Sequence, residues 1–82
     1  MNTRNLLERI TYNPEIFGGK AIIRGKRLAV EHVLEMMAAG STAEELVREY
    51  GWLEPEDVQA CLLYAAQVVG NEYFEPVLAE AE

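Results

Sequence analysis

Four basic side chains lie within eight residues in the first third of the chain: Lys20, Arg24, Lys26 and Arg27. The same stretch, residues 17–30, contains three glycines, which predict tight turns with the charges pointing outward. Ammonium and guanidinium groups on such an arm can contact nucleic-acid phosphates and enter a groove. The stretch therefore predicts a hairpin with a basic tip, and its four cations are candidate DNA-binding residues.

The distribution of charge supports a second interpretation of this basic arm. Residues 1–27 carry a net charge of +4, whereas residues 28–82 carry −11, so the two parts of the chain have opposite fields. Arg24 and Arg27 could therefore pair with acidic helices of the same chain or of a dimer mate. The sequence does not separate DNA contact from internal pairing, and both interpretations remain open.

Catalytic and metal-binding chemistry has little support in the sequence. His32 is the sole histidine and stands beside Glu31, without a serine, a cysteine or a second histidine at the spacing of a triad or a metal site. Cys61 is the sole cysteine and lies in an apolar run, which is typical of a small buried hydrophobe. We therefore expect no enzyme activity, no metal and no cofactor.

The first thirty residues favour a small antiparallel ribbon. Ile10 and Tyr12 alternate around Thr11 as in a strand, and Asn13-Pro14 then turns the chain. Leu6, Leu7 and Ile10 could instead form a helical turn, but we favour the strand. Glycine turns separate two further expected strands, at residues 21–23 and 27–29.

Three helices are expected after this ribbon. The first begins at Val30 with apolar residues at helical spacing and ends at Gly40. The second begins after Thr42, which forms a capping box with Glu45, and ends at Gly51. The third begins at Pro55 and continues to about residue 69. The predicted fold is mainly α, with an N-terminal β-ribbon followed by a three-helix bundle of helix-turn-helix type.

The third helix could enter a DNA major groove or could pack inside the protein. Groove insertion would let Gln59 read base edges, but Glu54, Glu56 and Asp57 would then face phosphates at its leading end. Residues 58–69 are apolar nearly all round, so this helix must be covered on more than one side. Because the rest of the chain offers little cover, we predict a homodimer.

We assign residues 1–70 to a single domain and residues 71–82 to an acidic C-terminal tail. Apolar residues in this tail repeat at a spacing of four and could anchor it in a partner's groove, or could cover the protein's own third helix. They are Tyr73, Phe74, Val77 and Leu78. No apolar run approaches the roughly 18 residues of a membrane span, so we expect a soluble cytoplasmic protein without a membrane partner.

Several short blocks in a fixed order carry a resemblance to a known family. They are Asn13-Pro14-Glu15, Gly18-Gly19-Lys20, Ile23-Arg24-Gly25, Arg27-Leu28, Val30, Ala39-Gly40, Glu45, Tyr50, Leu53, Glu56-Asp57-Val58 and Leu62-x-Tyr64-Ala65-Ala66. Over roughly residues 9–69 the chain resembles the "domain of unknown function 433" family. The resemblance implies a homeodomain-like fold and an antitoxin role with a nuclease toxin of the PIN-like kind as partner.

The chain departs from the pattern of this family at four positions. Ala21 and Gly51 stand where the family usually has Pro, and Lys26 and Glu54 stand where it usually has Thr. The departures at Ala21 and Lys26 make the arm less rigid and more basic. Those at Gly51 and Glu54 change the turn into the third helix.

These observations together predict a non-catalytic, antitoxin-like regulator. We expect it to neutralise a partner nuclease through its acidic face or its tail, and it could also bind operator DNA through the basic arm. The alternative is a protein–protein interaction module that does not bind nucleic acid.

Overall fold

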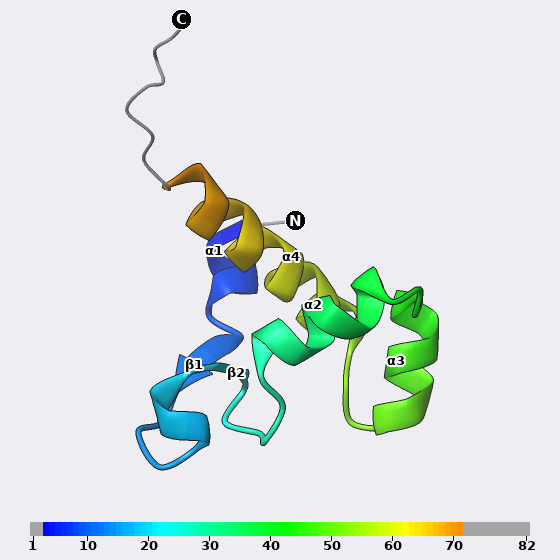
Figure 1. Ribbon diagram of the computed structural model, residues 1–82, viewed down its shortest axis with the longest axis horizontal. Helices are drawn as coiled ribbons and strands as arrows, with labels where there is room; N and C mark the ends of the chain where they lie inside the picture. Colours follow the sequence, from blue (N-terminus) through cyan, green and yellow to red (C-terminus); the bar gives the residue numbers. More distant parts are fainter. Residues whose placement is uncertain (1–2, 72–82) are drawn as a thin grey trace, which may run out of the picture.

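A computed structural model describes residues 3–71 of the chain (Figure 1). Its elements are α1 (Thr3–Leu7), β1 (Ile10–Tyr12), the 3-10 turn η1 (Phe17–Gly19), β2 (Ala21–Ile23), α2 (Val30–Ala38), α3 (Ala43–Tyr50) and α4 (Pro55–Gly70). The fold is mainly helical, with a small antiparallel sheet before the long helices. This architecture confirms the predicted fold class; the homodimer and the domain limits stay predictions.

The sheet has two strands rather than the three expected. β1 and β2 pair antiparallel with Ile10 opposite Ile23, whereas residues 27–29 contribute only a single bridge from Ala29 to Ile22. The expected third strand is wrong because the chain coils tightly after β2. The Leu28 amide donates to the Lys26 carbonyl at 2.9 Å, inside the turn, and is not available to a strand ladder.

The N-terminal segment forms both a helix and a strand, which we treated as alternatives. α1 occupies residues 3–7 and packs against α4, and β1 begins three residues later. Leu6 is buried in this contact. Helical propensity over five residues is too weak to indicate such an element, so α1 depends on its packing against α4.

Local sequence signals set the limits of the other helices as predicted. Gly40 follows α2 with a positive φ of 112°, a conformation that glycine adopts without a steric penalty. Thr42 caps α3: its hydroxyl accepts the Glu45 amide at 3.1 Å, and the Glu45 carboxylate accepts the Thr42 amide at 2.9 Å. Pro55 occupies the first turn of α4.

The core lies where α2, α3 and the first half of α4 meet β2. The largest fully buried side chains are Ile22, Ile23, Val30, Val33, Leu46, Val58, Asp57 and Cys61. Burial raises the pKa of the Cys61 thiol to about 12, and the nearby Asp57 carboxylate adds to this effect, so the thiol stays protonated and packs as a small hydrophobe.

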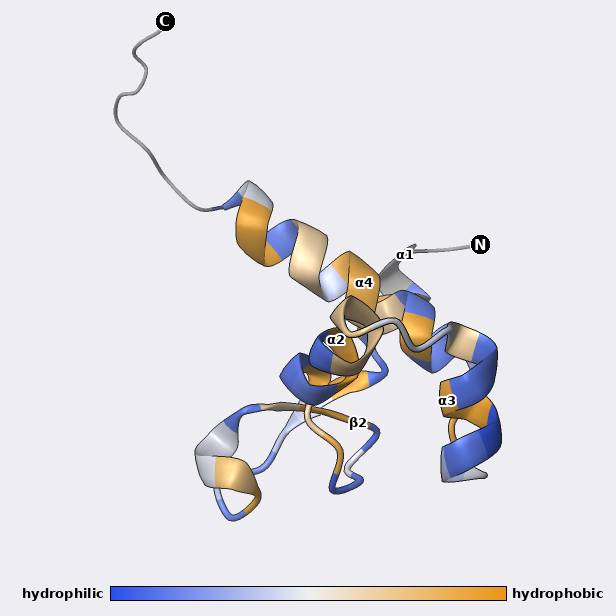
Figure 2. Cartoon of the chain, turned by 45° about the vertical axis from the view of Figure 1, so that its right-hand side comes forward, coloured by the Kyte–Doolittle hydropathy of each residue, from blue (hydrophilic) through white to orange (hydrophobic). Residues whose placement is uncertain are grey.

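The second half of α4 extends past this core (Figures 1 and 2). Leu62, Val68 and Val69 are 46%, 52% and 65% exposed, so the described chain leaves much of the apolar surface of α4 open. Among the described residues, no helix has the length and apolar character that a membrane crossing requires.

Replacing Thr42 with Ala should lower the free energy of unfolding by about 1 kcal/mol, because the Glu45 amide loses its capping acceptor. Thr42→Ser keeps a hydroxyl at the same position and should remain close to the parent. Urea denaturation followed by circular dichroism measures both differences. An Ala variant as stable as the Ser variant would show that the cap does not stabilise α3.

Candidate functional site

Arg24, the second of the four candidate DNA-binding cations, points into the protein. Its Nε donates to Asp57 Oδ1 at 2.9 Å, and its Nη2 donates to Asp57 Oδ2 at 2.7 Å. The same Nη2 also donates to the Trp52 carbonyl at 3.0 Å, and the guanidinium lies 5.6 Å from the centre of the Trp52 ring. This two-point pairing is the arrangement that the internal interpretation of the basic arm expects of Arg24.

Asp57 is fully buried and accepts hydrogen bonds from three segments. Besides Arg24, it accepts Arg9 Nη1 at 3.0 Å and the Glu54 amide at 2.8 Å. Burial alone would raise the pKa of this carboxyl, but the bonds from Arg24, the Glu54 amide and Arg9 hold the pKa below its usual value. Asp57 is therefore an ionised group that ties β1, the arm and the start of α4 together.

The other cations of the basic arm divide into one paired and two free side chains. Lys20 Nζ lies 2.8 Å from Glu31 Oε2 on the surface, and this hydrogen bond raises the pKa of Lys20. Lys26 and Arg27 are exposed and form no ion pair with any described residue, although Lys26 Nζ lies 5.6 Å from the centre of the Trp52 ring. Two cations thus remain available to a polyanion.

Gln59, the candidate base-reading residue, is exposed on α4. The acidic residues before it do not form a free acidic end, because Glu54 Oε1 accepts Arg9 Nη1 at 2.6 Å and Asp57 is buried. Gln59 follows Asp57 by two residues, which is about 200° around the helix, so it points away from the side of α4 that binds Arg24. The tail residues Tyr73, Phe74, Val77 and Leu78 lie outside the described residues.

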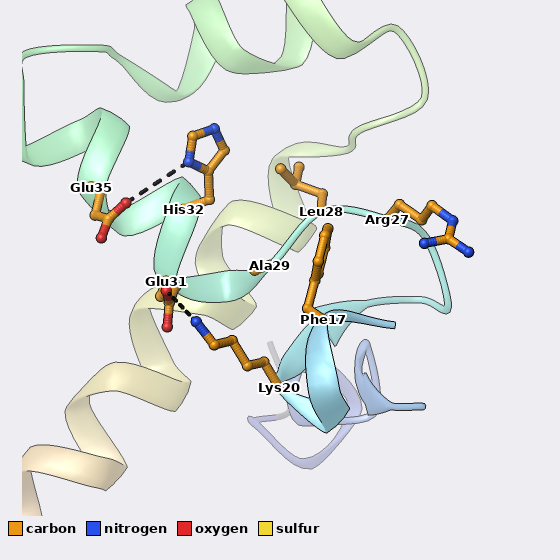
Figure 3. A pocket seen from close by; sticks show the side chains of 8 residues that line it. All are labelled: Phe17, Lys20, Arg27, Leu28, Ala29, Glu31, His32 and Glu35. Atoms are coloured by element: carbon orange, nitrogen blue, oxygen red, sulfur yellow. Dashed lines mark hydrogen bonds and ion pairs between the residues drawn. The ribbon is translucent and has the colours of Figure 1, made fainter. Parts of the chain in front are cut away.

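An open cavity of about 460 Å³ lies between η1, the end of the arm and α2 (Figure 3). Its lining combines apolar and charged side chains: Phe17, Lys20, Arg27, Leu28, Ala29, Glu31, His32 and Glu35. Phe17 is 46% exposed, with its ring turned toward Leu28. The Lys20–Glu31 pair and His32, whose Nδ1 lies 3.8 Å from Glu35 Oε1, stand on the opposite side.

Sequence reasoning missed this cavity as a site. The available signal was Phe17, an aromatic residue directly before two glycines, where burial is difficult. Its backbone has a positive φ of 52°, which is uncommon for a residue other than glycine. No group of three or more metal-ligating side chains occurs within residues 3–71.

The profile of a protein family described as "Protein of unknown function (DUF433)" matches residues 10–65. The chain belongs to this family. A stretch of 58 residues is also 33% identical to the "Uncharacterized protein y4eO" of Sinorhizobium fredii, covering 71% of this chain and 26% of that protein. No solved structure matches the chain.

Several residues that carry the DUF433 resemblance have structural roles. Arg24 and Asp57, the two partners of the buried ion pair, lie in two of its blocks. Gly25, in the same block as Arg24, and Gly40, in a further block, have positive φ angles of 71° and 112°. The resemblance therefore gives more information about how the fold is stabilised than about what the domain binds.

We expect Arg24→Ala to lower the free energy of unfolding by about 3 kcal/mol, because a buried carboxylate loses its two-point partner. Arg27→Ala removes an equal charge from the same arm without removing an ion pair, so its effect should stay within about 0.5 kcal/mol. Thermal and urea denaturation compare the two variants. Equal effects would contradict the structural role of Arg24.

Acidification should lower the free energy of unfolding of the parent protein, because it protonates Asp57. Because its folded pKa lies below the unfolded value of about 3.9, the stabilisation is present above that value and is lost as the pH falls below it. Asp57→Asn should be less stable than the parent at pH 7 but should lose less stability on acidification to pH 3. Parallel losses in urea midpoint for the two proteins would contradict this origin.

Proposed function

We propose that this DUF433 domain is a non-catalytic protein-binding module. One observation carries the proposal: two of the four cations of the basic arm already have carboxylate partners within the chain. Arg24 is bound to the buried Asp57 carboxylate, and Lys20 is paired with Glu31. A cation that already has a carboxylate partner gains little from phosphate, since the contact would first require the existing pair to break.

Operator binding is the second candidate, and the exposure of Lys26 and Arg27 favours it. These two cations lie in the turn after β2 and not at the tip of the β1–β2 hairpin, where the sequence predicted a basic tip. Two free cations supply few phosphate contacts, whereas the affinity of proteins for DNA depends strongly on their number. Residues 28–82 carry a net charge of −11, which repels a polyanion. The charge balance therefore favours a protein partner.

The cavity beside η1 is the proposed anchoring point for that partner. Phe17, Leu28 and Ala29 offer apolar surface, and charged side chains surround them. An apolar centre with a polar rim is the usual anatomy of a protein interface, where a few side chains inserted into pockets supply most of the binding free energy. A partner side chain of moderate size would fill this space.

The antitoxin-like role is the proposed form of this binding, acting in the cytoplasm on a nuclease of the PIN-like kind. Two features support it: the family resemblance, and an acidic region that complements the positive charge a nuclease uses to bind nucleic acid. The matched stretch also forms only 26% of the Sinorhizobium fredii relative, as expected of a module used within longer proteins.

Isothermal titration with the purified product of the adjacent gene, which the proposal expects to be a nuclease, tests the role. Phe17→Ala should weaken binding at least tenfold, because it removes the aromatic wall of the cavity. Tyr12→Ala is the matched control: Tyr12 is 60% exposed and lies outside the cavity, so its loss should change the affinity less than about threefold.

Absence of binding by the parent protein, or equal effects of the two substitutions, would contradict the proposal. Salt-titrated binding of the DNA upstream of the gene tests the second candidate. Operator binding is favoured instead if the parent binds this DNA and if Arg27→Ala reduces the slope of log affinity against log salt concentration by the amount expected for about one phosphate contact.

A further inference from the structure

The face of α4 that points away from the core carries a regular stripe of uncharged residues. Gln59, Leu62, Ala66 and Val69 follow one another at spacings of three, four and three, and all four are exposed. Asp57, Val58, Ala60 and Cys61, on the other side of the same helix, are buried. We call the four exposed residues the α4 seam.

We propose that a second copy of this chain docks on the α4 seam, helix against helix. The absence of charge on this face is the reason for choosing a second copy as the binding partner. From Val58 to Asn71 the helix carries no charged residue, although residues 28–82 as a whole have a net charge of −11. In a two-fold dimer each patch meets its own copy, so an acidic patch repels itself whereas an uncharged apolar one does not.

The spacing of the seam fits a second helix. Apolar residues alternating at three and four form the contact line between two packed α-helices, in which side chains of one helix fit between those of the other. Leu62 and Val69 supply apolar area, and the small side chain of Ala66 between them allows the two backbones to approach closely. Gln59 at the end of the line can hydrogen-bond to a neighbouring polar group or to water.

The charges at the start of α4 favour an antiparallel pair. Glu56 lies before the seam and forms no ion pair with any described residue, so two parallel copies would bring the two Glu56 carboxylates to the same end of the pair. In the antiparallel arrangement the two Glu56 side chains lie at opposite ends of the pair, and the helix dipoles are also aligned favourably. Gln59 of one copy then lies near Val69 of the other.

Sedimentation equilibrium over a range of chain concentrations tests this inference, which does not depend on the proposed function. The parent should form dimers in the micromolar range. Val69→Asp should raise the dimer dissociation constant about 100-fold, because two carboxylates would be buried without partners. Val68→Asp introduces the same charge one residue away, on an exposed residue that shares the side of α4 with Cys61 and not with the seam, and should change the constant less than about threefold.

Circular dichroism should show that both variants keep the parent fold, since Val68 and Val69 are exposed. A parent that remains monomeric at millimolar concentration would overturn the proposal and assign this face to another segment or partner. Equal effects of the two substitutions would overturn the placement of the interface on the seam.

Cross-linking tests the orientation. A mixture of Gln59→Cys and Val69→Cys variants should form a mixed disulfide on oxidation, whereas Val69→Cys alone should not form a homodimer. The native Cys61 is buried with a raised pKa, so it should not compete in the reaction. Efficient cross-linking of Val69→Cys to itself would overturn the antiparallel arrangement.

Discussion

The buried carboxylate of Asp57 is the constraint on which the rest of the structure depends. It lies at the start of α4, yet its hydrogen bonds come from Arg9 before β1, from Arg24 after β2 and from the Glu54 amide. A buried carboxylate is costly unless it is paired and fully hydrogen-bonded. The need to satisfy it therefore fixes the arm against the helical body, and it holds Arg24 in a left-handed conformation with φ of 47°.

This arrangement changes what the basic arm can do. In a stretch that looks like a nucleic-acid contact in the sequence, Arg24 connects the sheet to α4 and Lys20 pairs with Glu31 of α2, while Lys26 and Arg27 stay exposed. The surfaces that remain available are of another kind: an apolar cavity with charged edges beside η1, and the uncharged seam of α4. Both suit protein partners, and they lie on different elements, so one can bind a second copy while the other binds a different protein.

Much of the fold could be predicted because its signals are local. The capping box of Thr42, the glycines that end α2 and α3, and Pro55 each act within one helical turn. α1 depends instead on its packing against α4. Residues 27–29 do not form the expected third strand because of a tight turn. The Arg24–Asp57 pair joins residues 33 positions apart, and twelve acidic residues follow Arg24, so no local pattern could select the partner. The cavity likewise exists only where η1 meets α2.

A double-mutant cycle over Arg24 and Asp57 tests the central claim most directly. The free energies of unfolding of the parent, Arg24→Ala, Asp57→Ala and the double variant are compared at pH 7. If the pair holds the arm against the helices, the double variant should lose about 2 kcal/mol less stability than the sum of the losses of the two single variants. Additive losses within about 0.5 kcal/mol would contradict this account.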